Sequence, residues 1–261
     1  MLRLINFSPH SLFKYDETGL TVFQHEVCKV IPFKGKRLVS KSLQERGSLL
    51  TIVTCMNATT TYVSPLLVFP RSNKKAVLLD SALPVLIPAC HKAGWIRKES
   101  FTQWFKHFVR SVRLSKKDPV ILTLGGHYPH SRNMEVIDCA RENGVHIFCL
   151  SPHSTHYLQL LDVFFLQPLK TYYAQETEMW MKNHPNIVVT HYQISGMFGK
   201  AYSKSATEGI VANGFRKTDL FPYNLHILDE NDPEKILAHH HHFFAWNLCD
   251  MFQNCRRTAY Y

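Results

Sequence analysis

Apolar and β-branched residues gather in short runs that turn residues separate. Two such runs, Leu49–Met56 and Tyr62–Phe69, flank residues 57–61, whose sequence Asn-Ala-Thr-Thr-Thr is typical of a hairpin turn. An earlier run predicts a short strand over Ser11–Glu17 that ends at its acidic last pair and turns at Gly19. We therefore expect three strands in the first part of the chain.

The middle of the chain has the period of an amphipathic helix over Lys98–Arg113. Apolar side chains recur there at three- and four-residue spacing, which places them on one helical face; they are Phe101, Trp104, Phe105, Phe108 and Val112. The opposite face is basic, and it is either the solvated side of the helix or a surface that follows phosphates. Asp118-Pro119 is expected to stop this helix.

Strands and helices then alternate. Val120–Leu124 and His146–Leu150 are predicted strands, and Asn133–Glu142 between them is a predicted helix that ends at Asn143-Gly144. Strands that are joined by single crossover helices imply an α/β fold with a partly parallel sheet and helices on both faces.

The last part of the chain is predicted to be helical and then irregular. One helix is expected over Tyr157–Lys182, with a break or new start at Pro168, and another over Gln193–Ala212, which Gly214 ends. Three other segments lack periodicity: a basic loop or hairpin over Lys29–Arg46, an irregular insertion over 71–95, and an irregular C-terminal tail over 229–261.

Composition places the chain among ordinary globular proteins. Hydrophobic residues make up 45% and charged residues 19% of the 261 residues, and the formal net charge of +10 favours polyanions such as nucleic acid as partners. The seven cysteines are scattered without a C-x-x-C pair, which argues against a zinc ribbon or a disulfide framework and favours a reducing compartment. No apolar run predicts a membrane span.

The sequence lacks the motifs that mark nucleotide-binding sites and serine hydrolases. The chain has no G-x-x-x-x-G-K-[ST] or G-x-G-x-x-G segment, so no nucleotide cofactor is expected, and no G-x-S-x-G elbow of serine hydrolases.

Three positions could converge on the predicted sheet: Asp16, Gly125 and Asp162. Two carboxylates that meet would bind hard divalent cations, and a pair of such ions serves attack on phosphodiesters. Sequence spacing alone does not show that these positions meet.

A series of short motifs resembles the pogo/Tigger/jerky group of DDE-type DNA transposases. In chain order they are Tyr15-Asp16-Glu17-Thr18-Gly19-Leu20, Lys34-Gly35-Lys36, Glu45-Arg46-Gly47, Phe69-Pro70-Arg71, Gly94-Trp95, Gly126-His127-x-x-His130, Pro152-His153-x-Thr155-His156-x-Leu158-Gln159-x-Leu161-Asp162-Val163, Pro168-Leu169-Lys170, Gly214-Phe215-Arg216-Lys217-Thr218 and Leu220-Phe221-Pro222. The resemblance covers residues 7–228 and implies a ribonuclease H-like, retroviral integrase-like domain. Members of the group carry N-terminal helix-turn-helix domains, for which we expect no room before residue 7.

The resemblance also implies a catalytic site. Asp16 corresponds to the first catalytic aspartate and Asp162 to the third, and both would hold Mg²⁺ or Mn²⁺ in the ancestral site. The second aspartate corresponds to Gly125, which offers no side-chain oxygen, and Lys14 replaces the usual asparagine. Loss of one essential group forfeits orders of magnitude in rate. We therefore expect the triad to be reduced to Asp16 and Asp162 and the chain to be inactive or severely impaired.

Histidines and basic residues near these motifs have two interpretations each. His127, His130, His153 and His156 either form a zinc or manganese site or orient the backbone and carboxylates through hydrogen bonds. Lys34, Lys36 and Arg37 in the basic loop are expected to contact DNA phosphates, which gives weak, salt-sensitive and nonspecific binding.

Three functions follow as hypotheses. The leading one is a transposase-derived, nuclear DNA-binding domain with an incomplete two-metal site. The second is an endonuclease or transposase that remains active despite Gly125. The third is a non-catalytic interaction module or an expressed transposon relic. Neither the target DNA sequence nor the oligomeric state follows from the sequence.

Overall fold

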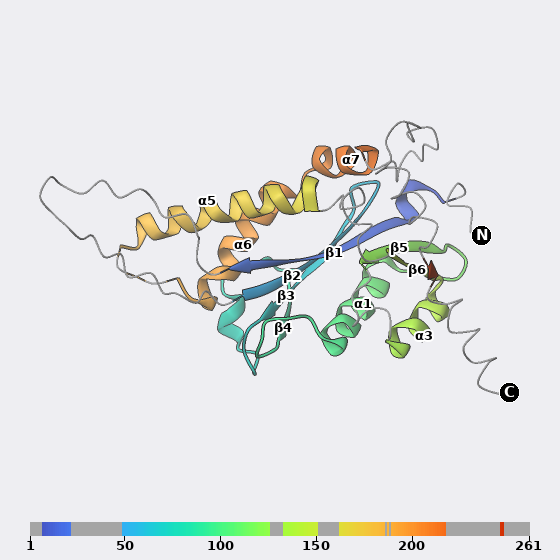
Figure 1. Ribbon diagram of the computed structural model, residues 1–261, viewed down its shortest axis with the longest axis horizontal. Coiled ribbons are helices and arrows are strands. Elements are labelled where there is room, and N and C mark those ends of the chain that lie inside the picture. Colours follow the sequence, from blue (N-terminus) through green and yellow to red (C-terminus); the bar gives the residue numbers. More distant parts are fainter. Residues whose placement is uncertain are drawn as a thin grey trace, which may run out of the picture.

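A mixed β-sheet forms the centre of the computed structural model (Figure 1). The structure describes residues 7–21, 49–125, 133–150, 162–185, 187, 189–217 and 246–247. Within these residues the sheet has seven strands in the order β4-β3-β2-β1-β5-β6-β7. The strands are β1 (Leu12–Thr21), β2 (Leu49–Asn57), β3 (Tyr62–Phe69), β4 (Ile87–Cys90), β5 (Val120–Gly125), β6 (Val145–Leu150) and β7 (Trp246–Asn247).

Strand directions follow from the connections. Strands β1, β2 and β3 are antiparallel neighbours, whereas β5 runs parallel to β1 and β6 runs parallel to β5. At the two edges, β4 is parallel to β3 and β7 is antiparallel to β6. Parallel neighbours need a crossover, and α3 supplies it between β5 and β6.

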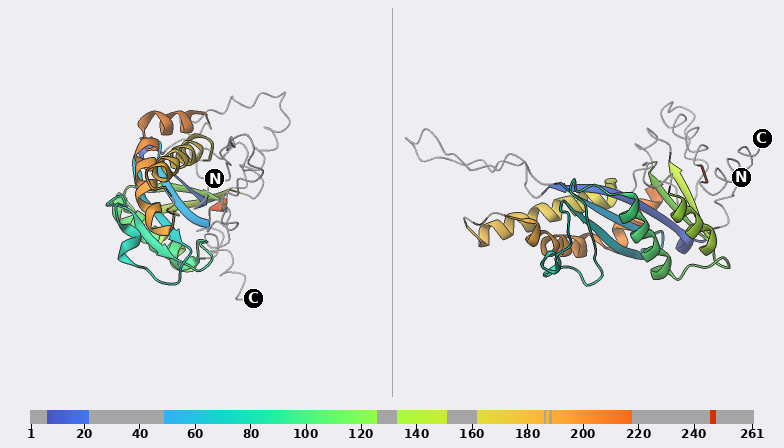
Figure 2. Two further views of the ribbon diagram at one scale, coloured as in Figure 1. Left: turned by 90° about the vertical axis from the view of Figure 1, so that its left-hand side faces the viewer. Right: turned by 90° about the horizontal axis from the view of Figure 1, so that it is seen from below.

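Helices cover both faces of the sheet. Helices α1 and α3 lie on one face, and α5, α6 and α7 lie on the other with the π-helical turn η4 (Figures 1 and 2). The helices are α1 (Lys98–Val112), α3 (Met134–Asn143), α5 (Gln167–Asn183), α6 (His191–Ser205) and α7 (Glu208–Lys217), with η4 over Asp162–Leu166 and short 3-10 turns η2 (Pro9–Ser11) and η3 (Ala76–Leu79). This mixed sheet between helical layers confirms the predicted α/β fold class, a mixed sheet flanked by helices.

Successive side chains of β1 point to opposite faces of the sheet, so they are divided between two hydrophobic cores. Phe13 and Tyr15 pack on α1, where Tyr15 meets Trp104 with ring centroids 4.5 Å apart. Leu20 points to the other face and joins the core formed with α5 and α6. Lys14, Asp16 and Thr18 share the parity of Leu20, and β1 therefore presents them towards the α5 layer.

The structure confirms helix α1, which the amphipathic pattern predicted. Phe101, Trp104, Phe105 and Phe108 are all fully buried against the sheet. The helix ends at Arg113, which adopts a left-handed conformation with φ 56°, so it stops before Asp118-Pro119. Helix α3 likewise has the predicted ends. The Asn133 side chain accepts the N–H of Val136, and Gly144 takes φ 70° at its C-cap.

Two predictions for the first half of the chain were wrong. Strand β1 does not turn at Gly19 but continues to Thr21, because Gly19 pairs with Thr51 and its missing side chain makes room for Leu49. The predicted irregular insertion over 71–95 contains β4, which pairs with the end of β3. Its short length and Pro88 hid this strand from pattern analysis.

The second half contains one further correction. The helix predicted over Gln193–Ala212 is two helices, because Ala206 leaves the helical conformation with ψ 63° and α7 starts anew. Gly214 lies inside α7 rather than ending it. Pro168 occupies the first turn of α5, where its missing N–H leaves no hydrogen bond unmade, and this agrees with the predicted new start.

Candidate metal-binding site

Asp16 lies in the middle of β1 on the face towards η4 and α5. Its carboxylate is half-buried, and Oδ1 accepts the backbone N–H of Glu17 at 2.9 Å. Thr54 of β2 is its direct cross-strand partner and shares its face. Asp16 is therefore held on a rigid strand rather than at the strand end where the sequence placed it.

Strand register brings Gly125 to the same place. Leu12 to Lys14 of β1 pair in parallel with Ile121 to Thr123 of β5. The same offset, carried two residues further along both strands, places Asp16 beside Gly125, the last residue of β5. Gly125 also pairs with Leu150 at the end of β6, so its backbone is fixed on that side as well.

The third position, Asp162, opens the π-helical turn η4. This turn contacts β1, and its residues Phe165 and Leu166 are buried in the core on the Asp16 side of the sheet. The turn that Asp162 opens thus packs on the face of the sheet that carries Asp16. The convergence of Asp16, Gly125 and Asp162 stays a prediction from the sequence.

Lys14 is the residue at this site whose importance sequence reasoning missed. It is only 3% exposed, although it carries an ammonium group, and it lies two residues before Asp16 on the same strand face. A buried charge is costly unless it is compensated, so a lysine is an unusual residue at such a position. The signal available in the sequence was a lysine at an inward position of a predicted strand.

Thr54 adds a second unusual polar group. The residue is fully buried, and its Oγ1 has no hydrogen-bond partner among the residues that the structure describes. Together with Lys14 and Asp16 it forms a polar island, by which we mean these three side chains, on the face of β1 and β2 that also carries Thr18 and the apolar Leu20, Leu50 and Ile52. In β1, β2 and β5, Asp16 is the one carboxylate on this face.

Glu17 does not contribute to this island. It points to the α1 face, where Tyr15 donates its hydroxyl to Glu17 Oε1 at 2.5 Å. Burial and the neighbouring Glu17 charge raise the pKa of Tyr15 well above its usual value, so the phenol stays protonated. The acidic pair is therefore split between the two faces.

Several predicted residues lie outside the described part of the chain. These are the phosphate-contact candidates Lys34, Lys36 and Arg37 and the histidines His127, His130, His153 and His156. Among the residues that are described, no group of three or more His, Cys, Asp or Glu side chains could hold a metal ion. One carboxylate beside a buried ammonium is a poor fit for two divalent cations.

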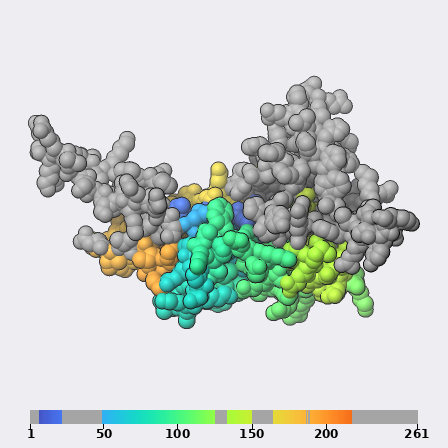
Figure 3. All heavy atoms as spheres, turned by 60° about the horizontal axis from the view of Figure 1, so that its bottom comes forward, coloured from blue at the N-terminus to red at the C-terminus, as the bar shows by residue number. Residues whose placement is uncertain are grey.

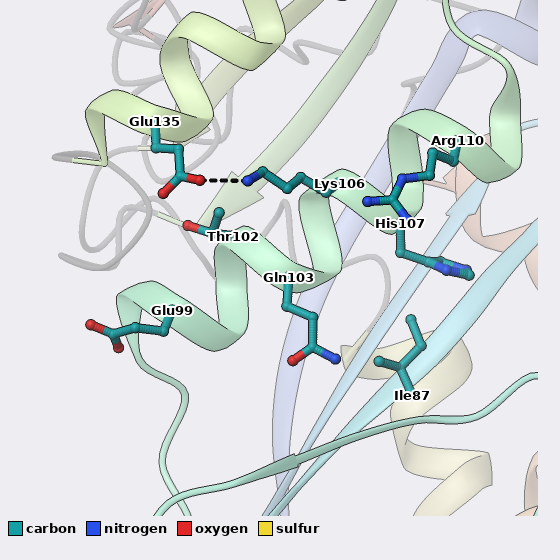
Figure 4. A pocket seen from close by; sticks show the side chains of 8 residues that line it. All are labelled: Ile87, Glu99, Thr102, Gln103, Lys106, His107, Arg110 and Glu135. Atoms are coloured by element: carbon teal, nitrogen blue, oxygen red, sulfur yellow. Dashed lines mark hydrogen bonds and ion pairs between the residues drawn. The ribbon is translucent and has the colours of Figure 1, made fainter.

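A polar groove of about 530 Å³ lies beside α1 on the opposite face (Figure 4). Its lining residues are Ile87, Glu99, Thr102, Gln103, Lys106, His107, Arg110 and Glu135. Lys106 is neutralised by Glu135 at 2.5 Å, and burial next to Arg110 lowers the pKa of His107. Because its closest charges pair with each other and Asp16 is not among its lining residues, this groove is not part of the candidate site.

Comparison with known proteins identifies the family. Residues 48–204 match the model of the DDE superfamily endonuclease family, and the chain belongs to this family. The matched stretch contains Gly125 and Asp162, whereas Asp16 precedes it.

A curated relative is the protein called MFS-type transporter clz9 from Cochliobolus lunatus, 24% identical over 235 residues. The alignment spans 87% of this chain but only 25% of that protein. None of the helices that the structure describes is long and apolar enough to span a bilayer.

Solved structures of Mos1 transposase also resemble the chain. The Mos1 mariner paired-end complex with Mn is 11% identical, with a TM-score of 0.46, and the match covers 81% of this chain and 53% of that chain. The Mos1 paired-end complex with the left transposon end has a TM-score of 0.41 at 10% identity, over 79% of this chain and 56% of that chain. The chain thus spans about half the length of these transposases.

Proposed function

We propose that this chain is a nuclear DNA-binding domain, derived from a pogo/Tigger-type transposase, whose two-metal site is incomplete. The β1–β5 pairing is the observation that supports the proposal: Leu12 to Lys14 pair with Ile121 to Thr123, and the same offset would set Gly125 beside Asp16, at the position that corresponds to the family's second carboxylate. The family is one of DNA endonucleases, and its chemistry needs carboxylates at this point. Glycine leaves the backbone in place and removes the ligand.

The buried Lys14 acts in the same direction as Gly125. One change removes a negative charge from the site, and the other puts a positive charge on the strand face that carries Asp16. Both weaken the attraction for Mg²⁺ or Mn²⁺, since close charges interact strongly where water is excluded. Asp16 and Asp162 are then remnants of the triad rather than a working metal site.

DNA binding is supported by charge and ancestry. A net charge of +10 attracts a polyanion without reading its sequence, and Lys34, Lys36 and Arg37 supply further phosphate contacts. Such binding is weak and nonspecific and should decrease steeply between low and moderate salt.

Restoring the site tests the proposal. Mn²⁺ binding is measured by electron paramagnetic resonance for the unchanged protein, for Gly125→Asp, and for Gly125→Asp combined with Lys14→Asn. The unchanged protein should bind no Mn²⁺ at millimolar concentration, and the double variant should bind more tightly than the single one. Asp16→Ala in the double background is the matched control and should abolish the gain.

Cleavage and DNA binding complete the test. The unchanged protein should not cut a transposon-end duplex with Mg²⁺ or Mn²⁺, and divalent-dependent cleavage that Asp16→Ala abolishes would show a working endonuclease instead. A duplex titration at two salt concentrations measures the binding. Affinity that is absent at low salt, or equal at both concentrations, would contradict the DNA-binding part of the proposal.

A further inference from the structure

Four strand ends and the start of α6 lie together at one end of the sheet. Thr21 at the end of β1 pairs with Leu49 at the start of β2, and Phe69 at the end of β3 pairs with Cys90 at the end of β4. The chain leaving β4 folds back there, with His91 N–H donating to Phe69 O at 3.0 Å. The connections that leave this end are therefore held close to the sheet.

The backbone that carries Trp95 is fixed at this end. Gly94 has φ 70°, and a Cβ on it would lie 2.1 Å from the Leu49 carbonyl oxygen, so only glycine fits. Thr51 donates its hydroxyl to Gly94 O at 2.7 Å, and Gly94 N–H donates to His91 O at 2.8 Å. Hydrogen bonds from Thr51 and to His91 therefore hold the backbone of this connection at Gly94.

Trp95 nevertheless points its indole into solvent. It is 56% exposed, whereas the next residue, Ile96, is 3% exposed and packs in the α1 core. A tryptophan left in water forgoes a large hydrophobic gain, and on a fixed backbone its exposure is not the result of a loose loop. An outward-facing indole on a fixed backbone is suited to stacking on a flat partner.

Cationic side chains follow both β3 and β4 around Trp95. Lys92 and Arg97 are exposed on its own connection, and Arg71, Lys74 and Lys75 lie on the neighbouring one. The two connections meet where Pro70 packs beside Gly94. We call Trp95 with these five cations the Trp95 surface. Figure 3 shows the segment after β3 in teal next to the orange atoms of α6.

Arg71 is the most firmly placed of these cations. Its Nη1 donates to the Tyr192 hydroxyl at 2.7 Å, and its guanidinium carbon lies 5.1 Å from the centroid of the same ring. This hydrogen bond lowers the pKa of Tyr192. Docking on Tyr192 reduces the side-chain entropy that Arg71 would lose on contacting a phosphate.

We propose that the Trp95 surface binds unpaired nucleotides of a DNA strand, with Trp95 stacking on a base and the cations contacting phosphates. The combination of an aromatic platform with a basic groove is how single strands are bound without sequence readout. A base inside a duplex is already stacked on both sides and offers no face to an indole. This inference rests on the proposed DNA-binding function and adds which form of DNA is preferred.

The surface lies within reach of the candidate metal-binding site. Asp16 and Thr21 are five residues apart on β1, which is about 17 Å at the usual rise of a strand. A strand that passes Asp16 could therefore place its unpaired end on Trp95.

Fluorescence anisotropy with labelled oligonucleotides tests this assignment. A single-stranded DNA, a blunt duplex and a duplex with a 3′ overhang are compared on the unchanged protein and on Trp95→Ala. The substitution should weaken binding of the single strand and the overhang about 5- to 100-fold, the range expected for losing one stacked base. Binding of the blunt duplex should change less than about twofold, since its bases are not available for stacking.

Two further variants act as controls. Trp95→Phe keeps an aromatic face and should retain most of the affinity. Val85→Ala removes a side chain of equal exposure, 56%, from the β3–β4 connection and should change nothing. Both substitutions are at exposed positions, and circular dichroism checks that each variant is folded.

Three outcomes would overturn the inference. If Trp95→Ala left single-strand affinity unchanged, or weakened duplex binding equally, the surface would not recognise unpaired bases, while the proposed DNA binding would stand. Tighter binding of single-stranded RNA of the same sequence would replace DNA as the partner. Failure to bind any of the three DNAs would contradict the proposed function as well.

Discussion

The two faces of the central sheet are built from different side chains. Towards α1, strands β1, β2 and β5 present aromatic and aliphatic residues such as Phe13, Val53 and Leu122. Towards α5, β1 and β2 carry the polar island of Lys14, Asp16 and Thr54, with Thr18 beside it, among apolar side chains. Apart from Glu17, which accepts the Tyr15 hydroxyl, and Thr51, the first face follows the requirements of packing. The second retains polar groups that packing would not select, which is expected where a site is or was.

The aromatic core under α1 should give the largest effect in testing this contrast. Trp104 is fully buried and stacks on Phe108 with ring centroids 5.6 Å apart. Trp104→Ala should lower the free energy of unfolding by about 3–5 kcal/mol, as for other large-to-small core changes. Urea denaturation followed by circular dichroism measures it. Gln103→Ala on the exposed side of the same helix should stay within about 0.5 kcal/mol. A loss below about 1 kcal/mol for Trp104→Ala would mean that this face is not a packed core.

A threonine-to-valine substitution should affect the free energy of unfolding differently on the two faces of the sheet. Thr102 donates to Lys98 O at 2.9 Å and accepts from the buried Asn133 at 2.8 Å, so Thr102→Val should destabilise by about 1–3 kcal/mol. Thr54 has no partner for its hydroxyl in the described part of the chain, so Thr54→Val should be neutral or stabilising by up to about 1 kcal/mol. The pair is measured by urea denaturation. A clear loss of stability for Thr54→Val would show that the polar island is part of the packing.

Lowering the pH should have the smallest effect on stability, and it should act through the helices on both faces of the sheet. Burial lowers the pKa of His107 on α1, assisted by Arg110, and of His191 on α6, assisted by Arg71. Both imidazoles therefore bind protons less readily in the folded protein than in the unfolded chain. Their contribution is present above the ordinary pKa of 6.5 and is lost as pH falls below it.

Melting temperatures between pH 7.5 and pH 5.0 measure this loss. His107→Gln and His191→Gln should each flatten the decline, and the double variant should be flatter than either. If neither single variant changed the slope, the two side chains would titrate alike in the folded and unfolded chain.

Local patterns predicted much of this fold. The hairpin strands, α1 and the caps of α3 were found because each is specified by side chains a few residues apart. Strand β4 was missed because four residues containing Pro88 carry too little pattern, and it exists through pairing with β3. The division of α6 from α7 at Ala206 was missed because apolar residues at helical spacing, Tyr202, Ala206 and Ile210, continue the pattern across it.

The candidate site was only partly visible in the sequence. Asp16, Gly125 and Asp162 were singled out by their places on the predicted sheet and by resemblance to a family, not by their spacing. Their predicted convergence requires the parallel pairing of β1 with β5, which joins residues far apart in the chain. The burial of Lys14 depends on what covers that face of the sheet, and its inward position on a predicted strand was the signal that the sequence carried.

The outer strands of the sheet have a consequence for behaviour at high concentration. Unpaired backbone groups along an exposed edge can recruit strands from other molecules and seed aggregates. Here β4 is four residues long and contains Pro88, which has no N–H to donate, and β7 pairs with β6 over two residues. At the β4 edge, shortness and the missing N–H leave little backbone on which another molecule could extend the sheet.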